Sequence, residues 1–166
     1  MAGDHRDPRA AAVRNRFLQV FGGPELPVRV DAIAEDLLGL AVAERELDVS
    51  GVLVPAQRRI WLKADEPAER KRFTLAHELG HWVCQCLEGR GEEVMCRVSE
   101  GGDPAVRANE REANIFAAEL LMPEDALRVA WPGEESVEVC AGRFRVSGEA
   151  MGWRLFNLGL VAESPA

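Results

Sequence analysis

The sequence predicts an α+β fold, a helix-rich domain that carries a small β-sheet or hairpin. Apolar residues recur at helical spacing through most of the chain, and two short runs have the composition of strands. At 166 residues the chain is long enough for one hydrophobic core, whereas a second full domain would be cramped. The chain contains no internal repeat and no low-complexity segment.

Glycine, proline and capping residues divide the first half of the chain into elements. The predicted elements are a helix over residues 9–21, a short helix over 32–38, and a hairpin of strands 51–54 and 59–62. Gly22-Gly23-Pro24 closes the first helix. Asp31 is the expected N-cap of the second helix, and Gly39 lies at its C′ position.

A longer helix is predicted next, starting at Asp65 and Pro67 and running to about Leu87. It is followed by a loop over residues 88–103 with room for a short strand over 94–98, a helix over 104–121, and a short helix after Pro123. The C-terminal segment, residues 136–161, is predicted to form two helices joined by a tight turn. We therefore expect a core, residues 1–135, and a C-terminal helix-turn-helix-like segment, residues 136–166, packed on it.

The composition argues against several classes of protein. With 20 basic and 28 acidic residues the net charge is −8, so direct binding of nucleic acid is not expected. Residues 1–17 lack the apolar core of a signal peptide, and no stretch approaches the ~20 apolar residues of a membrane span, which predicts a cytoplasmic protein without membrane contact. The four cysteines, Cys84, Cys86, Cys96 and Cys140, are expected to be reduced thiols rather than a metal site of their own.

The most informative stretch is Phe73–Trp82, FTLAHELGHW, which contains the pattern HExxH. Residues i and i+4 of a helix lie one above the other, roughly 5–6 Å apart at Cβ, so His77 and His81 can offer two imidazole nitrogens to one metal ion. Glu78 is rotated by about 100° from His77 and is placed to meet a water on that ion. The neighbouring positions on the histidines' side are apolar or small, so the motif points inward, where a metal would satisfy the imidazoles. We interpret it as the metal-binding helix of a zinc metalloprotease rather than as two surface histidines.

A catalytic zinc usually has three protein ligands, so a third one is needed. His5 lies in a polar N-terminal segment and is a poor choice. The helix over 104–121 offers Glu110, whose side of the helix is mostly small and apolar and can pack closely on the motif helix through Gly80. Glu112 lies on a more mixed surface. We predict Glu110 as the third ligand and keep Glu112 as the alternative.

Asn114 lies one turn after Glu110 on the same side of the helix. Its side-chain oxygen can accept the second N–H of a ligating histidine and so hold the ring in place. A simple helix–helix hydrogen bond is an equal alternative for this residue. Two imidazoles and a carboxylate suit Zn²⁺, although Mn²⁺, iron or nickel can bind the same donors.

Two strings of the sequence closely resemble the ImmA/IrrE metallopeptidases. They are residues 72–81, RFTLAHELGH, and residues 110–123, EREANIFAAELLMP. The hairpin, residues 64–70 and residues 144–159 are similar to the same family. The resemblance therefore covers most of the chain from about Val28 onward.

The resemblance implies a minimal zincin-like fold and a gluzincin-like zinc endopeptidase. In such an enzyme His77, His81 and Glu110 hold the zinc, and Glu78 is the catalyst. The Glu-x-x-x-Asp/Asn spacing of the second motif maps onto Glu110 and Asn114. Members of the family typically cut helix-turn-helix repressor proteins, so the resemblance also implies such a repressor as substrate and partner.

Two other functions are compatible with the sequence. One is a non-catalytic regulatory or partner-binding protein with a structural zinc, in which Glu112, Cys84 or a side chain of the partner closes the site. The other is DNA binding by the C-terminal segment, to which Arg143, Arg145 and Arg154 add positive charge. The acidic chain argues against DNA binding.

The sequence also poses questions about the substrate side of the site. The strand over 59–62 is either an edge that pairs with an extended substrate or part of a sheet that only covers the core. Trp61 and Trp82 are expected to be core residues rather than substrate contacts. The chain has no tyrosine, so an arginine, a backbone N–H or the metal has to stabilise the oxyanion of the reaction.

Overall fold

The computed structural model of the chain describes residues 5–90 and 103–166. Its α-helices are α1 (Pro8–Phe21), α2 (Val30–Ala32), α3 (Ala68–His81), α4 (Pro104–Leu121), α5 (Glu124–Ala130), α6 (Val137–Phe144) and α7 (Gly148–Asn157). Its strands are β1 (Ala41–Arg45), β2 (Gly51–Val54) and β3 (Arg59–Lys63), and the short 3-10 or π segments are η1 (Ile33–Leu37), η2 (Pro55–Gln57), η3 (Trp82–Cys86) and η4 (Trp131–Gly133). This confirms the predicted helix-rich α+β class. The strand predicted over 94–98, and Cys96, lie outside the described residues.

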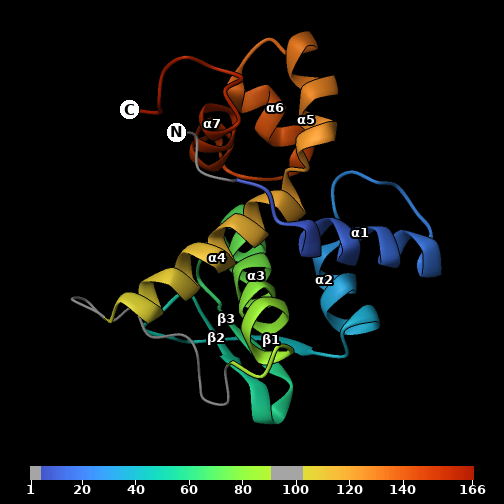
Figure 1. Cartoon of the computed structure of the whole chain (residues 1–166), viewed down its shortest axis with the longest axis vertical. Helices are drawn as coiled ribbons and strands as arrows, with labels where there is room; N and C mark the ends of the chain where they lie inside the picture. Colours follow the sequence, from blue (N-terminus) through green and yellow to red (C-terminus); the bar gives the residue numbers. More distant parts are fainter. Residues whose placement is uncertain (1–4, 91–102) are drawn as a thin grey trace.

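The helices are arranged around α3, the helix that contains the HExxH pattern. Helix α3 lies against β2 and β3 of the sheet, and helix α4 packs along α3 (Figure 1). On the other side α1 packs on α4 and on η1. Helices α5, α6 and α7 form a group beyond the C-terminal end of α4, away from the sheet (Figure 1). The long helix pair α3–α4 thus connects the sheet with the C-terminal helices.

Within the described part of the chain the sheet has three strands, in the order β1-β3-β2. Strands β2 and β3 are antiparallel, with Leu53 opposite Ile60, and form the predicted hairpin. Strand β1 was not predicted; it pairs with β3 in parallel, with Val42 opposite Ile60. Of the two alternatives left open for residues 59–62, an edge that pairs with substrate is excluded, because β3 lies in the centre of the sheet. Among the described residues β2 is an edge strand, and it contacts α3.

Local signals predicted most helix ends well. Asp103 and Ser136 cap α4 and α6, since their side chains accept hydrogen bonds from the first-turn backbone of these helices. Ser147 caps α7 in the same way, and Arg145 adopts a left-handed conformation (φ 54°) in the predicted turn before it. The helix–turn–helix pattern of the tail is therefore present as α6 and α7.

The cap proposed for the second helix is wrong. The helix begins at Val30, with Arg29 at the N-cap position and no side-chain hydrogen bond there. Asp31 is exposed inside the first turn, while Val30 is fully buried. Burial of the apolar side chain therefore sets the start of the helix, and the acidic residue complements the helix dipole instead. Gly39 has φ 66° just after the helix, as its predicted C′ position requires.

The hydrophobic core lies between α3, α4 and the inner face of the sheet and continues into the C-terminal helices. Trp82 belongs to this core, as predicted, with 7% of its surface exposed. Trp61 does not: its ring lies on the outer face of the sheet between the guanidinium groups of Arg45 and Arg59. Within residues 5–90 and 103–166 no helix is both long enough and apolar enough to cross a membrane.

Candidate metal centre

Three side chains from two helices meet at one point. His77 and His81 lie one turn apart on α3, and Glu110 reaches them from α4. The two Nε2 atoms are 3.1 Å apart. The Glu110 Oε2 atom lies 3.0 Å from Nε2 of His77, and its Oε1 atom lies 2.9 Å from Nε2 of His81. One donor atom from each residue lies within 4.8 Å of the other two, an arrangement that can hold a single metal ion.

The close approach of α3 and α4 brings these residues together. A Cβ atom placed on Gly80 would lie 2.8 Å from Cα of Ala113 and 2.9 Å from its carbonyl oxygen. The two backbones are therefore almost in contact, and only glycine fits at this position. Gly80 lies between the two histidines, and Ala113 lies one turn after Glu110. The packing of the second helix on the motif helix through Gly80, expected from the sequence, is confirmed.

Hydrogen bonds to the second ring nitrogens fix both imidazoles. The His77 Nδ1 atom lies 2.8 Å from Oδ1 of Asn114, and the His81 Nδ1 atom lies 2.6 Å from Oε1 of Gln85. The Gln85 side chain is oriented by its own amide, which donates to the carbonyl oxygen of Asn109 (3.3 Å). Because amide oxygens only accept hydrogen bonds, both Nδ1 atoms carry the proton, and both Nε2 atoms face the shared point.

The charges around this point call for a cation. Burial raises the pKa of Glu110, but hydrogen bonds and charge from His77 and His81 in their protonated form outweigh it and bring that pKa down to about 2. Burial lowers the pKa of His81, and the hydrogen bonds with Glu110 and Gln85 outweigh this effect, so the net change is upward. An ionised carboxylate facing two imidazole nitrogens is the donor set of a His₂Glu zinc site. The residues therefore fit a divalent metal ion.

Glu78 lies beside this cluster, between the two histidines in sequence. Its side chain is 1% exposed and lines the same cleft as His77 and Glu110. Edge strand β2 passes directly over it, because a Cβ atom on Gly51 would lie 3.4 Å from Oε1 of Glu78 and 2.5 Å from Cγ2 of Thr74. The carboxylate thus lies between the helix of the two histidines and strand β2.

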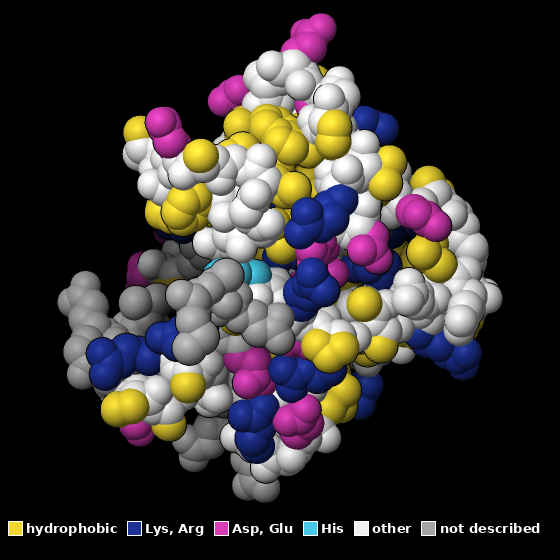
Figure 2. All heavy atoms as spheres, turned by 45° about the horizontal axis from the view of Figure 1, so that its top comes forward, with side chains coloured by type: hydrophobic (Ala, Val, Ile, Leu, Met, Phe, Trp, Pro, Cys, Tyr) yellow, Lys and Arg dark blue, Asp and Glu magenta, His cyan; other side chains and the backbone are white. Residues whose placement is uncertain are grey.

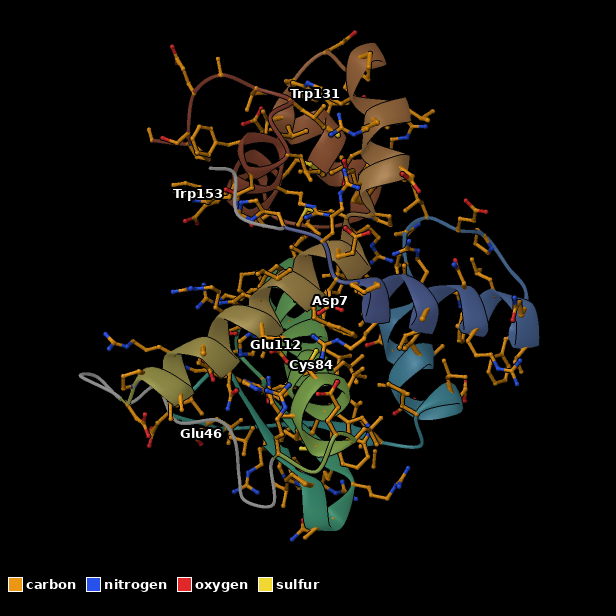
Figure 3. All side chains as sticks on the ribbon, viewed as in Figure 1. Asp7, Glu46, Cys84, Glu112, Trp131 and Trp153 are labelled. Carbon is orange, nitrogen blue, oxygen red and sulfur yellow. The ribbon has the colours of Figure 1, made fainter. Side chains whose placement is uncertain are left out.

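The alternative ligands are engaged elsewhere. Glu112 forms ion pairs with Arg90 (2.8 Å) and Arg9 (3.4 Å). Cys84 is buried and donates to Oδ2 of Asp7 at 3.7 Å. Figure 3 shows Glu112, Cys84 and Asp7 near one another, at the N-terminal end of α1. The geometry therefore brings Glu110, and not Glu112 or Cys84, to the histidines.

Two of the three candidate ligands, His77 and Glu110, lie on one side of a large cleft of about 1580 Å³. Helices α3 and α4 and the start of β2 form one side, and α6 and α7 form the other. His5, which was dismissed from the sequence, also lines this cleft. In Figure 2 histidine atoms are visible below the lobe of α5, α6 and α7, on which hydrophobic side chains gather.

Gln85 is the functional candidate that the sequence reading missed. It is completely buried in η3 and is the hydrogen-bond partner of a metal ligand. The signal was available, because His77, His81 and Gln85 continue the same i, i+4 spacing along one side of the helix.

The fold and this donor set define a class, the zincin-like metallopeptidase domain. The model of the family described as IrrE N-terminal-like domain, Peptidase_M78, matches residues 33–156. The chain belongs to this family of metallopeptidases, which confirms the ImmA/IrrE resemblance.

Comparison with solved structures supports the fold. A Mycobacterium tuberculosis transcriptional regulator superposes on the chain with a TM-score of 0.63 at 18% sequence identity. The match covers 88% of this chain and 45% of the regulator, so the chain spans less than half of that protein. At this identity the likeness is one of fold alone. No curated protein matches the chain.

Proposed function

We propose that the chain is a zinc-dependent endopeptidase that cleaves a helix-turn-helix transcriptional repressor and so relieves repression. The observation that carries the peptidase part is the convergence of His77, His81 and Glu110 within 4.8 Å, with Glu78 beside them in one cleft. The repressor as substrate and partner rests on the resemblance of the two sequence motifs to ImmA/IrrE peptidases.

Each residue around the centre has a defined task in this proposal. His77, His81 and Glu110 would hold a zinc ion, which would lower the pKa of a bound water to ~7 and polarise the carbonyl of the scissile bond. The Glu78 carboxylate accepts the proton of the attacking water and later delivers it to the leaving amine. Asn114 and Gln85 hold the imidazole rings in the orientation that presents Nε2.

The substrate strand can be held by the edge of the sheet. Among the residues that the structure describes, 5–90 and 103–166, strand β2 pairs with β3 on one side, and it passes over Glu78 at Gly51. An extended peptide that pairs with β2 would therefore lie along the catalytic carboxylate. On α4, the cationic side chains of Arg107 and Arg111 line the cleft, one turn before and one residue after Glu110. We propose that this positive charge supports the oxyanion in a chain without tyrosine.

The test is cleavage of a helix-turn-helix repressor encoded beside this chain. The zinc-loaded protein is expected to cut it at one position, and EDTA is expected to suppress the cut. Glu78→Gln should retain zinc and lose activity by about 10²–10⁴-fold, because it removes only the proton acceptor. Glu35→Gln, a matched change at an exposed residue of η1, should cut like the wild type. Full activity of Glu78→Gln refutes the mechanism.

The same experiment separates the alternative function. Tight association with the repressor, with no cleavage by the zinc-loaded wild type, would identify a non-catalytic zinc-containing regulatory protein. DNA binding by α6 and α7 is disfavoured by the contacts of their arginines. Arg154 is buried and paired with Glu119, and Arg143 is paired with Glu134. These guanidinium groups are therefore engaged within the chain, which supports the expectation that phosphate is not their ligand.

A further inference from the structure

The C-terminal helices form the wall of the cleft that faces the metal ligands. Residues of α7 that line the cleft include Ala150, Trp153 and Asn157, while His77 and Glu110 line it from α3 and α4. A peptide that extends from the metal centre along this cleft would therefore contact α7 as well. This makes α7 the natural place to look for residues that select the substrate.

Trp153 is an unusual surface residue. Its ring is 44% exposed, although the chain buries Trp82 to 7%. It is held edge-to-face against Phe156, with ring centroids 6.1 Å apart. In Figure 3 Trp153 lies on the outer side of α7, away from α5. A large aromatic ring left open in a peptidase cleft is the kind of group that anchors a binding partner.

The position of Trp153 is fixed by the residue that follows it. Arg154 is 2% exposed and donates to the carbonyl oxygens of Met122 (3.0 Å) and His5 (2.7 Å). It also forms a buried ion pair with Glu119 at the end of α4. These contacts tie α7 to the metal-bearing helix α4, so the tryptophan is presented to the cleft by a rigid element.

The surroundings of Trp153 define the chemistry of a ligand. The cleft is lined by apolar side chains from both walls, namely Phe73, Ile115 and Met122 on one side and Ala141, Val146 and Ala150 on the other. Two exposed carboxylates, Glu138 and Glu149, line the same wall as Trp153. Arg107 and Arg111 line the opposite wall, so the acidic groups act on the α6–α7 wall alone. There, an apolar surface with acidic groups beside it is complementary to a peptide segment that combines a large apolar side chain with a basic one.

We propose that Trp153 is a specificity-determining residue that binds a large apolar side chain of the substrate, with Glu138 and Glu149 favouring a neighbouring Lys or Arg. The proposal rests on the proposed function, since it names the class of peptide that the cleft takes. It assigns the C-terminal helix pair to substrate selection rather than to DNA.

The proposal is tested by affinity selection, which does not need catalysis. Zinc-loaded protein carrying Glu78→Gln is used to select binders from a random-sequence peptide library. Enrichment of large apolar residues with Lys or Arg nearby is expected. Adding Trp153→Ala should abolish the apolar preference and weaken the best selected peptide by about tenfold or more, because a buried aromatic anchor is lost. Trp153→Phe should keep most of the apolar preference and most of the affinity for the selected peptide.

Val139→Ala is the matched control, since Val139 is a 50% exposed apolar residue of α6 that does not line the cleft. It should select and bind like the parent protein. Unchanged selection by Trp153→Ala in a protein with normal zinc content and circular dichroism overturns the proposal, as does a parent that enriches acidic or purely polar peptides. Cleavage of the repressor is scored separately with the wild type. If the expected peptides are selected but the wild type does not cleave the repressor, the peptidase function is rejected and the peptide-binding role of Trp153 is kept. If the wild type cleaves the repressor but selection does not depend on Trp153, the peptidase function is kept and the role of Trp153 is rejected.

Discussion

Replacing Gly80 by alanine tests the distance between the two helices on which the metal centre depends. The added Cβ atom would lie 2.8 Å from Cα of Ala113, whereas ordinary contact begins at 3.4 Å. The difference, about 0.6 Å, has to come from separation of α3 and α4, because the clash is with backbone. Metal–ligand distances tolerate only about ±0.2 Å, so the donors on the two helices would no longer close on one ion.

The magnitude follows from two opposing effects. Alanine in place of glycine stabilises a helix interior by ~1 kcal/mol, and overpacking of a tight contact costs ~1–3 kcal/mol. Gly142→Ala on α6 measures the helix-propensity effect alone, since a Cβ atom there meets nothing within 4 Å and causes no overpacking. We expect Gly142→Ala to raise the free energy of unfolding and Gly80→Ala to fall below it by ~1–3 kcal/mol. If the same strain opposes metal binding, zinc affinity of Gly80→Ala drops by about 10- to 100-fold.

The assay has two parts, urea unfolding of the metal-free proteins and competition for zinc with a chromophoric chelator. The free energy of unfolding reports the helix contact, and the competition reports the closure of the site. Gly142→Ala should match the wild type in zinc affinity. If Gly80→Ala binds zinc as tightly as the wild type and is as stable as Gly142→Ala, the helices are not as close as described, and the argument for the site fails.

Two more predictions concern the helix that follows the motif. Gln85→Leu should lower zinc affinity by about 10- to 100-fold, because His81 loses its buried acceptor, whereas Gln85→Glu keeps an acceptor and should keep the affinity in the same chelator competition. Equal affinity in all three proteins would mean that Gln85 does not position the ring. Burial, reinforced by Asp7, raises the pKa of Cys84 to about 12, so at pH 8 its thiol stays protonated and should resist iodoacetamide until the chain is unfolded, as peptide mass mapping can show. Fast modification of native Cys84 would indicate a thiolate, the form that a metal-ligating cysteine needs.

Much of this fold could be predicted because its signals are local. Proline, glycine and short polar residues mark the ends of α1, α4, α6 and α7, and each side chain acts within one turn of its position. His77 and His81 are equally local, since the helix alone sets their spacing. The prediction of Glu110 required one further step, a comparison of the sides of a second helix. The small residues on the side of Glu110 indicated that this side packs on the motif helix.

What could not be predicted depends on contacts between distant segments. The sequence of β1, Ala41–Arg45, has little strand character of its own and becomes a strand by pairing in parallel with β3. Because of that pairing, β3 lies in the centre of the sheet rather than at its edge. Trp61 is apolar in sequence yet lies outside, since the alternation along β3 directs Ile60 and Leu62 to the core. The wall formed by α7 depends on the ion pair of Arg154 with Glu119, 35 residues away.

The metal centre is therefore defined by distances between elements as much as by the HExxH pattern. The pattern places two ligands on one helix, but the third ligand and the proposed substrate edge can contribute only if their elements come close to that helix. Gly80 permits the approach of α4, and Gly51 permits the approach of β2, because a side chain at either position would collide with Ala113 or Thr74. A chain with the same histidines and larger residues at these two positions would keep the motif and lose the site. The small residues that surround an HExxH pattern are thus a physical criterion for separating metal centres from chance matches.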